Sequence, residues 1–188
     1  MTYHLQCYDL ALSFLSKRKN MADIYSTKAF IDHLQQSYPD QAEFLQAAEE
    51  VSRSVKPLIN DNSKLFHGKV MQRLAEPDRI ISFRVTWKDD QGDIQINRGW
   101  RVQQSNLLGP YKGGLRFHPS VTESVLKFLA FEQCFKNALT GLPMGGGKVG
   151  LILILRGAQT MKLWRFVRRL CLNYINTLGL KPMCLLVI

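Results

Sequence analysis

Three lysines and one glutamine stand in contexts that could do chemistry. Lys112 lies in the run GPYKGG and Lys148 ends the run MGGGK, and glycines beside a lysine allow a substrate to approach the backbone closely. Gln133 and Lys136 are three residues apart in a predicted helix, so they project from one face of it. Several cations around one cavity would bind a small molecule rich in carboxylates. Crowding and desolvation would also lower the pKa of at least one lysine and make it a base near neutral pH.

Each of these features also has an ordinary structural explanation. A glycine-rich turn that carries a lysine is most often a plain loop, and Lys112 or Lys136 taken singly would be a solvated surface charge. Gln133 taken singly could be an amide on a helix surface. The run GGGK is not a phosphate-binding loop, because the spacing of that motif and the Ser or Thr after its lysine are missing. It is not a dinucleotide fingerprint either, because that motif needs GxGxxG after a strand.

The elements that must position these residues begin with two predicted helices. Ser26 and Thr27 can cap a first helix that continues to about Ser37. Asp40 can cap a second helix, which Pro57 is expected to end or bend. Their apolar faces contain Phe30, Ile31 and Leu34 in the first helix and Phe44, Leu45, Ala48 and Val51 in the second.

The hydrophobic period then changes to two, which predicts a β-hairpin over 81–102 with a turn at 89–92. A short strand, GLRFH, follows a glycine-rich turn. A helix is predicted over 121–139, with a buried stripe of Val125, Leu126, Leu129, Ala130, Cys134 and Phe135. These elements predict an α/β or α+β domain in which helices pack on a sheet.

Composition limits the class of protein. At 188 residues with 46% apolar residues, the chain is expected to form one folded domain, alone or with tails. The four cysteines have neither metal nor disulfide spacing, which suits a reducing cytoplasm. The N-terminus is not typical of a secretory signal, and no apolar run approaches the ~20 residues of a spanning helix.

The positive charge is divided unevenly along the chain. The net charge is +10, but residues 1–148 hold 19 Lys and Arg against 15 Asp and Glu. Residues 149–188 hold six basic residues and no acidic one. The composition therefore changes immediately after Lys148.

Taken together, the runs around the four polar residues resemble one protein family. GPYKGGLRFHPSV, KFLAFEQCFKNALTGLPMGGGK and the upstream RLAEPDRIISFRVTWKDDQGDIQINRGWRVQ are similar to the N-terminal domain of hexameric glutamate dehydrogenases, in the Glu/Leu/Phe/Val dehydrogenase family. The resemblance extends from about Met21 to Lys148 almost without gaps. It implies an amino-acid dehydrogenase N-terminal domain, with helices packed on a mixed sheet, that serves substrate binding and oligomerisation.

The resemblance also implies roles for the four residues. Lys112 matches the residue that holds the substrate side-chain carboxylate, a cation that the related leucine, valine and phenylalanine enzymes do not need. Gln133 and Lys136 match partners of the α-carboxylate. Lys148 matches the catalytic lysine that activates water against the imino intermediate.

The glutamate dehydrogenases that the chain resembles oxidatively deaminate L-glutamate to 2-oxoglutarate and ammonia, or run the reverse. They use NAD or NADP, which a second, Rossmann domain binds, and they form homo-oligomers. For this chain we accordingly expect a cytoplasmic NAD(P)-dependent oxidoreductase, a hexamer by family, with no metal, nucleic-acid or membrane partner. We expect no cofactor-binding residue and no Rossmann domain among these 188 residues.

After Lys148 the resemblance stops in this reading frame. The family continues with a second glycine pair, a polar stretch close to SDFDPKG, and later VPAGD, whose Asp transfers a proton. If plausible codons for residues 149–188 are read one base out of frame, residues 151–157 become Phe-Asp-Phe-Asp-Pro-Lys-Gly, and residues 182–188 can become Thr-Asp-Val-Pro-Ala-Gly-Asp. We therefore expect residues 1–20 to be an unexplained extension, residues 21–148 to be the glutamate dehydrogenase-like domain, and residues 149–188 to be an out-of-frame tail. Such a fragment is expected to be inactive alone.

Two other classes of function stay open at this point. The chain could be a basic binding module whose tail contacts nucleic acid, in which case the binding should depend strongly on salt. It could instead be an interaction partner that joins dehydrogenase hexamers, in which case it should co-purify with a full-length enzyme.

Sequencing of the gene from the Gly145 codon past the stop codon tests the predicted shift. We expect a one-base difference near the Lys148 codon that restores the family text through VPAGD. An unaltered frame in the genome, with a transcript that matches it, would instead establish residues 149–188 as the translated tail.

Overall fold

The computed structural model describes residues 25–89 and 91–153. The predictions made for residues 1–20 and for the tail beyond residue 153 lie outside this part of the chain. The described residues form two compact units, one made of residues 25–39 and 45–73 and the other of residues 40–44 and 74–153. The second unit contains all four candidate site residues.

The first unit is helical, as its sequence predicts. Helix α2 spans Thr27–Ser37, and the Ser26 hydroxyl caps it by accepting a hydrogen bond from the Ala29 N–H at 3.2 Å. Helix α3 spans Ala42–Asp61, and α4 (Ser63–His67) and α5 (Val70–Ala75) are short. The predicted start and end of α2 are therefore confirmed. The serine begins the helix because its hydroxyl pairs a backbone N–H that the helix itself leaves unpaired.

The expectation that Pro57 could end the second helix is wrong. Pro57 lies inside α3, which continues for four more residues to Asp61. A proline inside a helix lacks one backbone N–H and crowds the preceding turn. Burial of apolar side chains at both ends of the helix, from Phe44 to Ile59, offsets that cost.

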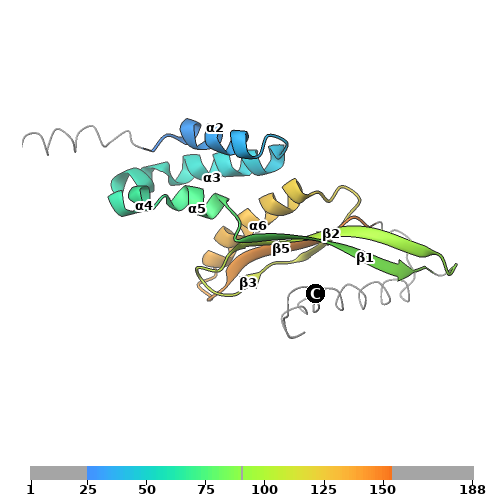
Figure 1. Ribbon diagram of the computed structural model, residues 1–188. Coiled ribbons are helices and arrows are strands. Elements are labelled where there is room, and N and C mark those ends of the chain that lie inside the picture. Colours follow the sequence, from blue (N-terminus) through green and yellow to red (C-terminus); the bar gives the residue numbers. More distant parts are fainter. Residues whose placement is uncertain (1–24, 90, 154–188) are drawn as a thin grey trace, which may run out of the picture. The chain divides into compact units, whose positions relative to one another are not determined.

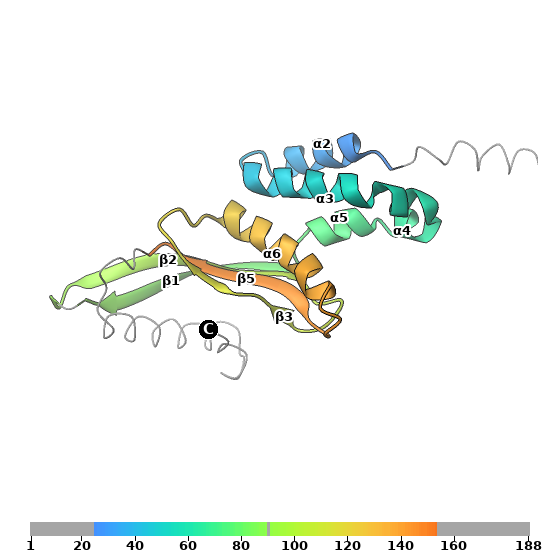
Figure 2. The same cartoon turned by 180° about the vertical axis from the view of Figure 1, so that it is seen from behind.

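The second unit contains a five-stranded mixed sheet, which confirms the expected fold class. Strand β1 (Arg79–Lys88) pairs antiparallel with β2 (Ile94–Ser105), and β2 pairs antiparallel with β5 (Gly145–Leu151). The short strands β3 (Tyr111–Lys112) and β4 (Leu115–Phe117) both pair parallel with β5. Helix α6 (Glu123–Ala138) lies along one face of this sheet (Figures 1 and 2).

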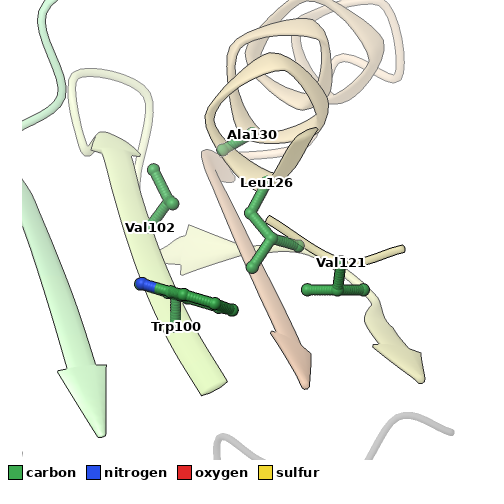
Figure 3. Packing of buried hydrophobic residues seen from close by; sticks show 5 residues of the cluster. All are labelled: Trp100, Val102, Val121, Leu126 and Ala130. Carbon is green, nitrogen blue, oxygen red and sulfur yellow. The ribbon is translucent and has the colours of Figure 1, made fainter. Parts of the chain in front are cut away.

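The hairpin register places the two apolar series on opposite faces of the sheet. Ser82 lies opposite Trp100 and Ile80 opposite Val102, so the even-numbered residues of both strands share one face. On the face of α6, the buried cluster consists of Trp100, Val102, Val121, Leu126 and Ala130 (Figure 3). On the other face it consists of Val85, Val149, Leu151 and Leu153.

The stripe predicted for α6 omits its most unusual buried residue, Lys127. Leu126 and Ala130 are buried as expected, but Lys127 is fully buried too, with its Nζ 4.2 Å from the centre of the Phe44 ring. Burial lowers the pKa of Lys127 to about 8, although the charges of Glu76 and Glu123 act in the opposite direction. Within the described residues, no helix is long and apolar enough to cross a membrane.

Replacing Lys127 with methionine is expected to stabilise the protein at pH 7 by roughly 1–3 kcal/mol, because a buried ammonium is exchanged for an apolar chain of similar length. The unfolded lysine keeps its proton up to about pH 10.5, whereas the folded one loses it near pH 8, so the stability of the unsubstituted chain should rise between these values. Urea unfolding at pH 7 and pH 10 measures both effects. The exposed Lys88→Met variant is the control, and a Lys127→Met variant less stable at pH 7 would contradict the prediction.

Candidate active site

Strand β5 carries the glycine run, so the alternative that this run is a plain loop is wrong. Gly145–Leu151 pairs with β2 on one side and with β3 and β4 on the other. Lys148 lies opposite Val102 and therefore faces α6. Gly146 and Gly150 share this face, so Lys148 is the one long side chain that β5 directs toward the helix.

The two glycines allow α6 to lie directly against the strand. A Cβ on Gly150 would come within 2.5 Å of a methyl group of Leu126, and a Cβ on Gly146 would overlap the Cys134 sulfur. Larger residues at these positions would separate the helix from the strand. The close packing also buries the Cys134 thiol and raises its pKa to about 11, which excludes it as a nucleophile near neutral pH.

Lys148 has the electrostatic character expected of a base. It is half-buried, and its Nζ lies 3.4 Å from the point that a Cβ on Gly114 would occupy. Burial is the largest cause that lowers the pKa of Lys148, followed by the positive charges of Lys136 and Arg116. The direction agrees with the expectation from the sequence.

Lys112 is placed by its backbone. It lies in β3 beside Gly146 of β5, and its side chain is exposed. The carbonyl of the preceding residue, Tyr111, accepts a hydrogen bond from the buried Arg101 at 3.1 Å, and the Tyr111 hydroxyl donates to Asp78 at 2.9 Å. These bonds fix the turn that presents Lys112.

Gln133 and Lys136 lie on the last turns of α6. Gln133 is half-buried, and its Nε2 donates to the Asn137 Oδ1 at 2.8 Å. Lys136 is exposed and pairs with Glu132 at 2.8 Å, one helical turn away. An exposed ion pair of this kind contributes little to the free energy of folding. Lys136 can therefore exchange Glu132 for another anion at little cost.

The structure thus brings the four residues to one region without joining their side chains to each other. Lys112 and Lys148 lie on the adjacent strands β3 and β5, and the charge of Lys136 acts on Lys148. Among the described residues, no hydrogen bond links the side chains of these four.

Sequence reasoning missed Arg116 and Asn137. Arg116 lies in β4 opposite Gly150 and influences Lys148 by its charge. Asn137 is buried and holds both Lys112 and Gly145 by hydrogen bonds to their carbonyl groups. Both residues lie within the sequence runs quoted above. Strand pairing places Arg116 near Lys148 and burial places Asn137 between the strands, and hydrophobic periodicity in the sequence reveals neither strand pairing nor burial of a polar residue.

A metal site and a dinucleotide site each require a particular local arrangement of residues. No group of three His, Cys, Asp or Glu in this part of the chain could hold a metal ion. A dinucleotide needs a glycine-rich turn between a strand and a helix N-terminus. Gly145–Gly147 lie inside a paired strand, and Gly113–Gly114 lead from one strand to another, so neither run in the described ranges fits that group.

Comparison with known proteins identifies the family. The family model described as the Glu/Leu/Phe/Val dehydrogenase dimerisation domain matches residues 77–182, more than half of the chain. The chain belongs to the Glu/Leu/Phe/Val dehydrogenase family. The match continues past Lys148 into the stretch that we expect to be out of frame, so the boundary at Lys148 stays a prediction.

The chain is similar in sequence to several glutamate dehydrogenases. The NADP-specific glutamate dehydrogenase of Psychrobacter sp. (strain TAD1) is 54% identical over 148 residues, which are 79% of this chain and 32% of the relative. The NAD-specific glutamate dehydrogenase of Bacteroides fragilis (strain YCH46) is 50% identical over 146 residues, 78% of this chain and 33% of the relative.

The fold is also similar to that of solved glutamate dehydrogenases. The crystal structure of Plasmodium falciparum glutamate dehydrogenase matches with a TM-score of 0.76 and 44% identity, over 80% of this chain and 32% of that one. The chain therefore spans about a third of the length of the relatives that it matches.

Replacing Arg116 with glutamine is expected to raise the pKa of Lys148 toward its ordinary value, because one of the two neighbouring positive charges is removed. NMR titration of the lysine Nζ and Cε resonances measures this pKa. Arg84→Gln, at an exposed position on β1, is the control and should leave it unchanged. An unchanged pKa in Arg116→Gln would mean that Arg116 does not contribute to the shift.

Proposed function

We propose that this chain forms the substrate-binding part of an NAD(P)-dependent glutamate dehydrogenase, which oxidatively deaminates L-glutamate to 2-oxoglutarate and ammonia or runs the reverse. The observation that carries the proposal is the half-buried Lys148, whose pKa is lowered by burial and by the charges of Lys136 and Arg116 and whose neighbours on the same face of β5 are both glycines. The glutamate dehydrogenases among its relatives support the choice of substrate.

The substrate is held by its two carboxylates. Lys112, exposed on β3, binds the side-chain carboxylate, and Gln133 and Lys136 on α6 bind the α-carboxylate. Charge-assisted hydrogen bonds of this kind are stronger than those between neutral groups. The two carboxylates also reduce the repulsion among the cations, so binding a dianion relieves a cost that the empty site carries.

Lys148 acts as the base for the step that adds water. In its neutral form the amine accepts a proton from water while the water oxygen bonds to the imino carbon of the substrate. The protonated lysine returns the proton to the amino nitrogen of the adduct, and ammonia leaves as the hydroxyl group loses its proton, which gives the 2-oxo acid. The lowered pKa increases the fraction of neutral amine near neutral pH, so the rate of this step rises as the pH rises through that pKa.

The nicotinamide cofactor, NAD or NADP, would accept the hydride, and we propose that it binds outside the described residues. We further propose a cytoplasmic homo-oligomer, in keeping with the dimerisation domain that the family model describes. The 188 residues alone are proposed to bind substrate without turning it over.

Calorimetric titration of the 188-residue chain tests the substrate. We expect 2-oxoglutarate to bind more tightly than 2-oxobutyrate, which lacks the second carboxylate. Lys112→Met should weaken 2-oxoglutarate about tenfold or more, as loss of a hydrogen bond to a charged group implies, and leave 2-oxobutyrate almost unchanged. Lys88→Met is the surface control. Equal binding of the two acids by the unsubstituted chain would refute the proposal, and NAD(P)H-dependent turnover would refute the claim that the chain is inactive alone.

A further inference from the structure

Asn137 occupies an unusual place at the end of α6. Its side chain is 4% exposed, and its amide makes three hydrogen bonds. The Nδ2 donates to the carbonyl of Lys112 at 3.1 Å and to the carbonyl of Gly145 at 2.7 Å, and the Oδ1 accepts from the Gln133 Nε2 at 2.8 Å. An asparagine amide has two N–H groups, so both donors are used on the two carbonyls and the amide orientation is fixed.

Each of the three partners belongs to a segment that holds a proposed substrate group. Lys112 is the residue proposed for the side-chain carboxylate, and Gln133 is proposed for the α-carboxylate. Gly145 begins the strand that carries Lys148, three residues further on. Asn137 is thus a single buried residue that is hydrogen-bonded to β3, to β5 and to the Gln133 side chain of α6.

From this geometry we propose that Asn137 is a positioning residue that sets the distance between the two carboxylate-binding groups and thereby selects a dicarboxylic substrate. The inference rests on the proposed function. Asn137 touches no substrate in this role. It acts through the backbone of Lys112 and through the amide of Gln133.

The bond to Gln133 has a direct chemical consequence. The Gln133 nitrogen also has two N–H groups, and Asn137 accepts one of them. The other N–H is then oriented by a buried acceptor and can donate to a carboxylate. Without Asn137, the Gln133 amide could rotate, and the carbonyls of Lys112 and Gly145 would lose a buried donor that they share.

A purely structural role makes a different prediction from a positioning role. If Asn137 only satisfies buried carbonyls, its loss lowers the stability and weakens all ligands alike. If it sets the spacing between Lys112 and Gln133, its loss weakens a ligand that bridges them more than a ligand that meets only one. The ratio of the affinities for 2-oxoglutarate and 2-oxobutyrate separates these two cases.

The experiment compares that ratio in the 188-residue chain and in Asn137→Ala by calorimetric titration. We expect the preference for 2-oxoglutarate to fall about fivefold, as loss of a net hydrogen-bond contribution implies, while binding of 2-oxobutyrate changes little. In the unsubstituted chain, 2-oxoglutarate should also shift the Gln133 side-chain amide resonance, and this shift should shrink in Asn137→Ala. Asn137→Ser, which keeps a single donor, should be intermediate and serves if the alanine variant does not fold.

Thr140→Val is the matched control. The Thr140 hydroxyl donates to the Asn137 carbonyl at 2.7 Å and accepts from the Leu142 N–H at 3.2 Å, and among the described residues it makes no hydrogen bond to β3 or β5. This variant should keep the full preference. An unchanged preference in folded Asn137→Ala or Asn137→Ser, or an equal loss in Thr140→Val, overturns the positioning role. If the unsubstituted chain itself shows no preference, the proposed function fails, and the positioning role fails with it.

Discussion

The close approach of α6 to β5 is the constraint on which the site depends. Helices normally pack on a sheet through a layer of side chains, but Gly146 and Gly150 remove that layer on both sides of Lys148. The helix can therefore lie against the backbone of the strand, and the amine of the lysine between the two glycines reaches Gly114. This packing partly buries the amine of Lys148, and that burial is the main cause of its lowered pKa.

The same packing concentrates positive charge. Lys136 comes from the helix and Arg116 from β4, and both act on Lys148. Like charges that act on one another oppose folding, and the anionic ligand proposed for this site would reduce that cost. Lys127 is a different case, because its ammonium lies over the ring of Phe44 and the charges of Glu76 and Glu123 act on it. Burial is the largest cause of the lowered pKa in both lysines, but the neighbouring charges oppose the shift at Lys127 and add to it at Lys148.

Local chemistry was readable from the sequence wherever a single segment determines its own structure. The Ser26 cap, the hairpin with its turn at 89–92 and the short strand at Leu115–Phe117 all follow from side-chain types and period. The prediction that Pro57 could end the second helix failed, because burial of apolar side chains along α3 outweighs the local cost of a proline. The glycine run was open to interpretation as a loop, because glycine is a poor strand former and only pairing on both sides makes it a strand here.

By itself, the sequence determined the family, the class of fold and the four polar residues proposed for a dicarboxylate site, because these depend on residue types at fixed spacings along the chain. Tertiary structure alone decided which face of β5 Lys148 takes, that Arg116 joins the charged group, and that Asn137 ties Lys112 to Gln133. These features arise from contacts between residues far apart in the sequence, such as Lys148 and its strand partner Val102, which are 46 positions apart. A contact of that kind depends on strand register and helix packing, and neither is encoded in any one segment.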